Sequence, residues 1–165
     1  MATPLGHSIV GYTLARAAGV RHPGALGAAI ATACLPDVDF LLGYVTQGDL
    51  LSLHHEVITH KPVFPLLVGG VTGLAAAGAA LLRGRTPRSR DVLGPAGIAA
   101  GLVASHVVMD RLPVPYDVMP MRSASLWEVG VSQAWNAVVD MAFYGTLAAL
   151  IFDRNGANGK RAEAH

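Results

Sequence analysis

Charged residues are scarce in this chain of 165 residues. Asp, Glu, Lys and Arg make up only 14% of it, whereas a soluble globular domain carries about 25%. Hydrophobic residues make up 52%, and the mean hydropathy is +0.44. These values exclude a disordered chain, which would be polar and highly charged, and they disfavour an ordinary water-soluble globule. The composition is that of a small polytopic membrane protein.

The chain also has very little cysteine and no excess of charge of one sign. Cys34 is the only cysteine, which excludes an internal disulfide framework and a zinc module built from several thiolates. Twelve basic against eleven acidic residues give a net charge of +1, so no basic surface points to nucleic acid. Seven histidines, however, are many for a chain with so few charges. Any chemistry is therefore to be sought first around the histidines.

Long apolar runs dominate the second half of the chain. Residues 63–82 form a run of twenty uncharged residues, which as a helix would measure about 30 Å, the thickness of a bilayer core. Residues 92–109 and 135–152 form two further runs, each with a single ionisable residue, His106 and Asp140 respectively. These three runs are predicted to be membrane-spanning helices.

Two shorter apolar runs precede them, at residues 5–20 and 24–35. They are predicted to form a shallow hairpin that turns at Pro23, because the second run is too short to span comfortably. We therefore predict an all-α, polytopic membrane bundle of about five helices, the first two short. It would form one domain over residues 1–165, with a polar tail at 153–165.

The distribution of basic residues predicts the orientation. Four arginines lie between residues 83 and 90, and short arginine-rich links between membrane helices stay in the cytoplasm. In the five-helix topology, nine of the twelve basic residues then lie on the cytoplasmic side. The three on the outer side are Lys61, Arg111 and Arg122.

This topology gathers ionisable residues at the extracytoplasmic end of the helices. Such groups are costly near hydrocarbon, and where they occur they usually mark a functional site. The members are His7, Asp37, Asp39, His55, His60, His106 and Asp110.

The spacing within this group indicates a metal. His106 and Asp110 are four residues apart, so they share one helix face and can share an ion. Neutral imidazole and carboxylate are the usual zinc ligands outside thiolate sites. Each piece taken alone also fits a plainer role, such as a polar contact between helices, a helix cap or an Asx turn.

Four motifs together resemble a known family, over about residues 5–120. They are Gly6-His7, Leu35-Pro-Asp-Val-Asp39, His55-x-x-x-Thr-His60 and Ser105-His-x-x-x-Asp110. The combination resembles the bacterial inner-membrane metal-dependent hydrolases, also described as LexA-binding inner-membrane regulators. That family often has Arg-Gly after the first histidine of the third motif, whereas Glu56-Val57 stand here.

The order of the motifs is also distantly similar to zinc-dependent phospholipase C and the single-strand-specific zinc nucleases. Those enzymes have an N-terminal tryptophan ligand and a later histidine pair, and both are missing here, which favours one or two metal ions over three. The resemblance implies a principal site of Asp39, His60, His106 and Asp110, with His7 holding a second ion. Asp37 and His55 would be a ligand, a base or a group that orients a ligand.

The expected function is that of a membrane-bound, metal-dependent hydrolase of the bacterial inner membrane. The metal would be divalent, with zinc favoured, and the site would face the extracytoplasmic interface, where membrane lipids are at hand. The expected substrate is a phosphodiester or a phospholipid. Two alternatives stay open: a non-enzymatic membrane regulator with a structural metal, and a transporter with a proton or cation path along His106, Asp110 and Asp140.

Overall fold

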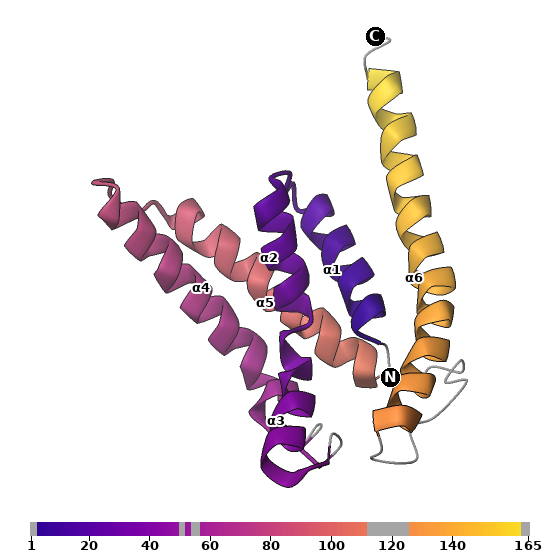
Figure 1. The fold of residues 1–165 in the computed structure, drawn as a ribbon. Helices are drawn as coiled ribbons and strands as arrows, with labels where there is room; N and C mark the ends of the chain where they lie inside the picture. The colour runs from indigo at the N-terminus through magenta and orange to yellow at the C-terminus, as the bar shows by residue number, and fades with distance from the viewer. Residues whose placement is uncertain (1–2, 50–51, 54–56, 112–125, 163–165) are drawn as a thin grey trace.

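The computed structural model of the chain describes residues 3–49, 52–53, 57–111 and 126–162, and all the regular structure in these ranges is helical. This confirms the all-α prediction. Over the described residues, six α-helices follow one another with two single-turn 3₁₀ helices between them (Figure 1). In chain order they are α1 (Pro4–Ala17), α2 (Pro23–Ala33), η1 (Leu35–Asp37), α3 (Val38–Gln47), η2 (Ile58–His60), α4 (Val63–Leu82), α5 (Ser89–Arg111) and α6 (Leu126–Ala162).

Three helices among the described residues are long and apolar enough to cross a membrane. They are α4, α5 and the segment Ala134–Phe152 of α6. Helix α2 and the η1–α3 segment pass the same test only as a pair, bent by 53°, and so form a broken span or a re-entrant loop. Helix α1, with 14 residues, would measure about 21 Å and is too short to span alone. Helix α6 continues through most of the expected tail, to Ala162.

The bend after α2 was not predicted from the sequence. Helix α2 ends at Ala33, and a further helix, α3, for which the sequence carried no prediction, runs from Val38 to Gln47. Pro36 lies in the turn between them and has no N–H to continue the hydrogen bonding of α2. The chain therefore restarts in a new direction, and Asp37 and Asp39 lie at this corner rather than beyond the end of a hairpin.

Small residues set the closest helix contacts. A Cβ atom on Gly69 of α4 would lie 2.9 Å from both the Ala100 Cβ and the Ala96 carbonyl oxygen of α5. A Cβ on Gly11 of α1 would likewise lie 2.6 Å from the Ala33 Cβ of α2. These glycines allow the close helix approach that is common in membrane bundles.

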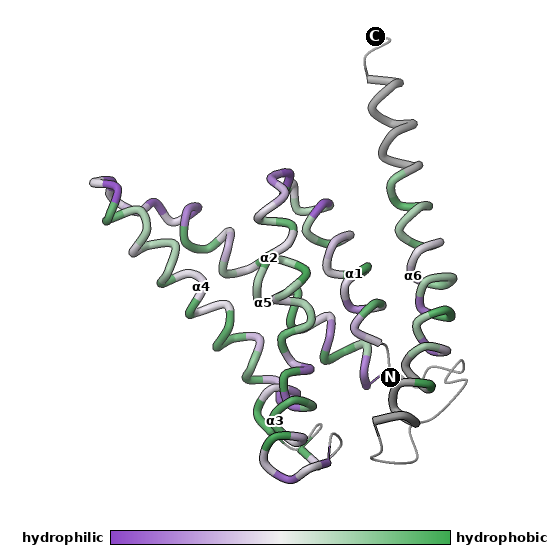
Figure 2. Tube along the Cα trace, viewed as in Figure 1, coloured by the Kyte–Doolittle hydropathy of each residue, from purple (hydrophilic) through white to green (hydrophobic). Residues whose placement is uncertain are grey.

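The distribution of polarity between inside and outside is that of a membrane protein. Many large apolar side chains are exposed, among them Leu66, Leu74 and Leu82. Figure 2 shows the apolar residues along the middle of α4 and polar residues at the turn that follows it. The largest fully buried side chains, by contrast, include His7, His106, Asp39 and Asp140. The bundle thus encloses its ionisable groups and presents its apolar ones.

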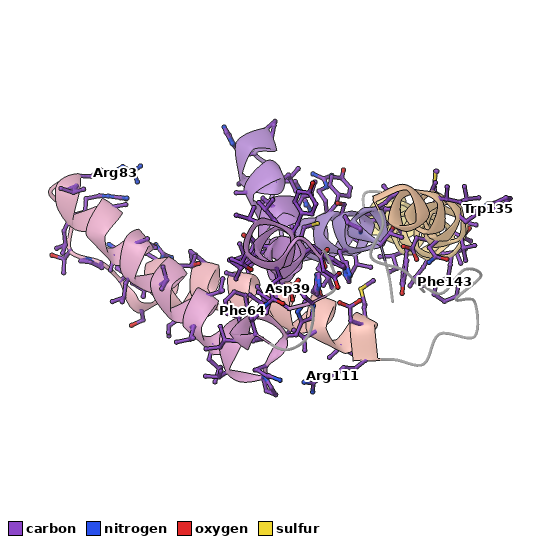
Figure 3. The ribbon with its side chains drawn as sticks, turned by 60° about the horizontal axis from the view of Figure 1, so that its bottom comes forward. Asp39, Phe64, Arg83, Arg111, Trp135 and Phe143 are labelled. Carbon is purple, nitrogen blue, oxygen red and sulfur yellow. The ribbon has the colours of Figure 1, made fainter. Side chains whose placement is uncertain are left out.

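The arginine-bearing turns and the histidine cluster lie at opposite ends of the bundle. The turn after α1 and the turn after α4 lie at one end, whereas α3 and the first turns of α6 lie at the other (Figure 1). In Figure 3, Arg83 lies at the far end of α4 from Asp39. Arg16, Arg21 and the arginines of residues 83–90 therefore share the end opposite the histidine cluster, as the predicted topology requires.

Candidate metal centre

Helix α1 carries His7 into the bundle. Thr3 caps this helix, and Thr3 is itself held by Asp140 of α6, whose Oδ2 accepts hydrogen bonds from the Thr3 backbone N–H and Oγ1, both at 2.6 Å. The His7 ring is 1% exposed and stacks on the ring of His106, with centroids 3.5 Å apart and planes 15° from parallel. His7 thus lies against α5 near the N-terminal end of α1.

Helix α5 contributes His106 and Asp110 from one face. His106 Nε2 lies 3.0 Å from Asp110 Oδ2, the contact expected from their four-residue spacing. The other oxygen of Asp110 lies 3.4 Å from His7 Nε2. The Asp110 carboxylate therefore bridges the Nε2 atoms of the two stacked rings, one oxygen to each.

The corner between α2 and α3 brings in Asp37. Its Oδ1 lies 3.3 Å from His106 Nε2. The Asp37 side chain is 14% exposed, whereas those of His106 and Asp110 are 0% and 1% exposed. Asp37 therefore forms the more open side of the cluster.

These four side chains form the candidate centre. His7, Asp37, His106 and Asp110 each offer one nitrogen or oxygen atom, and all four atoms lie within 4.8 Å of one another. The ring nitrogens of His7, Nε2 of His106 and Oδ2 of Asp37 are buried and make no hydrogen bond of good geometry, although both Nε2 atoms lie close to carboxylate oxygens. Buried polar atoms normally have partners, since leaving one unsatisfied costs about 1–3 kcal/mol. Imidazole nitrogens and carboxylate oxygens that converge in this way fit a divalent metal ion.

A hydrogen bond to the backbone orients His106. Its Nδ1 lies 2.7 Å from the carbonyl oxygen of Ala33, at the end of α2. A carbonyl can only accept, so Nδ1 carries a proton, and in the neutral ring Nε2 is then the nitrogen whose lone pair faces the cluster. Metal-binding histidines typically have a second hydrogen bond of this kind.

His60 lies next to the four-residue group. Its Nε2 lies 3.2 Å from Asp110 Oδ2, and its Nδ1 lies 2.8 Å from Asp39 Oδ2. Thr59 Oγ1 donates a hydrogen bond to the same Asp39 oxygen, at 3.2 Å. Asp39 is 0% exposed and lies behind His60, in the position of a carboxylate that orients a metal-binding histidine.

The carboxylates around His60 also control its protonation. Burial disfavours the charged imidazolium, but the hydrogen bonds to Asp110 and Asp39 outweigh it and raise the pKa of His60 above its ordinary value. A proton and a metal ion compete for a histidine nitrogen, so a metal at this position displaces a proton.

The residues selected from the sequence divide into three groups. His7, His106, Asp110 and Asp37 form the four-residue group, and His60 contacts it through Asp110. Asp39, expected as a ligand, contacts His60, whose Nδ1 lies 2.8 Å from Asp39 Oδ2. His55 lies outside the described residues.

Two residues near the site were not selected as members of it. Arg111, counted only as a basic residue of the outer side, donates from Nη2 to the carbonyl oxygen of His60, at 3.1 Å. Asp140, assigned above only to the proton or cation path of a transporter, accepts hydrogen bonds from Thr3. The position of Arg111 directly after Asp110 was the signal available in the sequence.

Comparison with protein-family models identifies the family of this chain. The model of the YdjM inner membrane protein family matches residues 1–154. The chain belongs to this family. Together with the membrane-capable helices, the match identifies a multi-pass protein of the bacterial inner membrane, as predicted. Comparison with curated proteins and with solved structures gave no match.

Proposed function

We propose that this YdjM-family protein is a membrane-bound, metal-dependent hydrolase with its centre at His7, Asp37, His106 and Asp110. The observation that carries the proposal is the convergence of two buried imidazoles and two carboxylates, in which the ring nitrogens of His7, Nε2 of His106 and Oδ2 of Asp37 make no hydrogen bond. Apolar side chains at these positions would avoid the cost of burying such atoms. A bound cation would be coordinated by these atoms and would offset that cost.

Zinc is the metal that this ligand set favours. The two imidazoles and the Asp110 carboxylate match the three protein ligands of catalytic zinc sites without thiolates, which leave a further position for water. His60 lies close enough to Asp110 to complete a site or to share a second ion, so one or two ions fit. When bound, the metal would supply an activated water and polarise the substrate oxygen.

The surrounding residues have separate tasks in this proposal. The Ala33 carbonyl holds His106 in the tautomer that points Nε2 into the centre. Asp39 holds His60 through Nδ1. Asp37, the most exposed carboxylate of the four-residue group, is positioned to take a proton from an attacking water, as a general base.

The location of the centre favours a substrate of the membrane interface. The cluster lies at the end of α5 away from the arginine-bearing turns, where headgroups of the outer leaflet would lie in the expected topology (Figure 1). A phosphodiester or phospholipid at that depth can reach the more open side of the cluster at Asp37.

A non-enzymatic regulator with a structural metal is the second candidate. The near-complete burial of His7 and His106 favours it, because structural sites are closed whereas catalytic sites keep an open position. A transporter is less favoured. Asp140, the remaining ionisable residue of the predicted path, is held by Thr3 at the same end of the bundle.

Metal analysis and turnover distinguish these candidates. The detergent-purified wild type is compared with His106→Ala and with His22→Asn, a control in which an exposed histidine cap is replaced by another capping residue. We expect zinc and hydrolysis of bis-p-nitrophenyl phosphate in the wild type and in the control, and neither in His106→Ala. Zinc without turnover of this substrate or of phospholipid supports the structural metal, and a wild type without metal refutes both.

A further inference from the structure

A small cavity opens beside the candidate centre, at the end of α5. Its volume is about 60 Å³, and it is lined by His60, Val107, Asp110 and Arg111. A space of this size holds one or a few groups the size of water. Because His60 and Asp110 belong to the cluster, a group in the cavity would lie against the centre and against Arg111 together.

Arg111 is held in place over this cavity. It is the last residue of α5 and directly follows Asp110, and its side chain reaches back to donate to the His60 carbonyl at 3.1 Å. A guanidinium is a rigid plane with five N–H donors, so fixing one of them also sets the directions of the others. Arg111 is exposed and can therefore meet a molecule that arrives from outside the bundle.

With a single divalent ion bound, the charge of the cluster favours such a residue if the substrate is an anion. Asp37, Asp39 and Asp110 bring three carboxylates, and one divalent cation neutralises only two of those charges. An anionic ester would then approach a centre of its own sign. The positive charge of Arg111 removes this mismatch beside Asp110.

We propose that Arg111 is the anion-binding residue of the centre and that its guanidinium takes an oxygen of a phosphate ester in the cavity. This inference rests on the proposed function and narrows the substrate class to anionic phosphate esters. Arginine suits this role because its fork of donors matches phosphate oxygens and because it stays charged at any physiological pH.

Binding of phosphate itself tests the inference without depending on turnover. The full chain, loaded with zinc and freed of excess metal, is titrated by calorimetry with inorganic phosphate and, separately, with dioctanoyl phosphatidylglycerol. The variants are Arg111→Gln, Arg111→Lys and, as the matched control, Arg90→Gln, which removes the same charge from a side chain 77% exposed at the start of α5. Zinc per protein is measured for each variant.

We expect Arg111→Gln to keep its zinc and to weaken phosphate binding by about 10-fold or more, the loss of a charge-assisted hydrogen bond. Arg111→Lys should recover part of the affinity, and Arg90→Gln should match the wild type. Weakening with both ligands supports recognition of the phosphate group itself, and weakening with the lipid alone supports a headgroup presented on its chains.

Two results would overturn the role of Arg111. One is a zinc-loaded Arg111→Gln protein that binds both ligands as the wild type does, and the other is an equal loss in Arg90→Gln. A wild type that binds zinc and phosphate but hydrolyses nothing would refute the enzyme and leave this binding role supported. A wild type without zinc would refute both.

Discussion

The Asp140 carboxylate of α6 accepts two hydrogen bonds from Thr3, at the N-terminus of α1. These bonds join the last helix of the bundle to the first. Gly6 makes the approach possible, because a Cβ atom there would lie 2.6 Å from Asp140 Oδ2. Asp140 therefore acts on the position of α1, and through α1 on His7, without belonging to the centre.

Replacing Asp140 with Ala should destabilise the protein more than it depletes the metal. The change leaves the buried Thr3 donors without their acceptor, and we expect a loss of about 1–2 kcal/mol, typical of polar contacts between membrane helices. The measurement is the melting temperature and zinc content in one detergent, beside Asp110→Asn. If Asp140→Ala lost as much zinc as Asp110→Asn at an unchanged melting temperature, Asp140 would have to be counted as a ligand.

Adjacent glycines of α4 should respond differently to the same substitution. Gly69→Ala places a methyl group 2.9 Å from Ala100 Cβ and from the Ala96 carbonyl, so α4 and α5 must separate. We expect a destabilisation of about 1–3 kcal/mol. Gly70→Ala is the matched control, because its Cβ would meet nothing within 4 Å and alanine favours the helix. Thermal unfolding followed by circular dichroism compares them, and equal melting temperatures would contradict the packing described.

Replacing Asp39 should lower the metal affinity less than replacing Asp110 does. Asp39→Asn weakens the acceptor on His60 Nδ1, and residues that orient a ligand typically contribute about 10–100-fold to affinity. Asp110→Asn, which alters a member of the four-residue group, should cost more. Competition with a chromophoric zinc chelator measures both, with Asp91→Asn at the other end of α5 as the control. A larger loss in Asp39→Asn than in Asp110→Asn would make Asp39 the direct ligand.

The topology is open to a direct test with reporters. A fusion after Arg88 should be active as a cytoplasmic reporter, and one inserted near Gln47 as an extracytoplasmic reporter. The reason is that nine of the twelve basic residues fall on one side in the predicted arrangement. Alkaline phosphatase and green fluorescent protein at both points give opposite signals. The reverse pattern at both positions would put the histidine cluster on the cytoplasmic side.

The spanning helices were predictable because hydropathy and length suffice for them. The apolar run at residues 63–82 coincides with α4, and the run at 92–109 lies within α5. Helix α3 was not predictable in the same way. A leucine–proline–aspartate sequence equally fits an Asx turn and the start of a new helix, and tertiary packing decides between the two.

The side chains of the candidate centre were predictable from the sequence only in part. The i, i+4 spacing brought His106 and Asp110 together, since helix periodicity is local. The roles of Asp37 and Asp39 depend on how the chain turns at Pro36, and no periodicity spans that corner. The contact of Arg111 was not predictable, because its partner is a backbone carbonyl, and only its position directly after Asp110 pointed to the site.

The hydrogen bond between His106 and Ala33 links the shape of the chain to the chemistry of the ring. Asp37 N–H bonds to the Cys34 carbonyl, and Pro36 has no N–H, so the turn leaves the Ala33 carbonyl to His106. A straight helix through this corner would draw the same oxygen into its own ladder and release the ring. The 53° bend and the orientation of His106 Nε2 toward the cluster therefore occur together in one conformation. Because this coupling is reciprocal, a ligand that binds Nε2 in the bent conformation also stabilises the bend. Any change that straightens the bend lowers the affinity for that ligand.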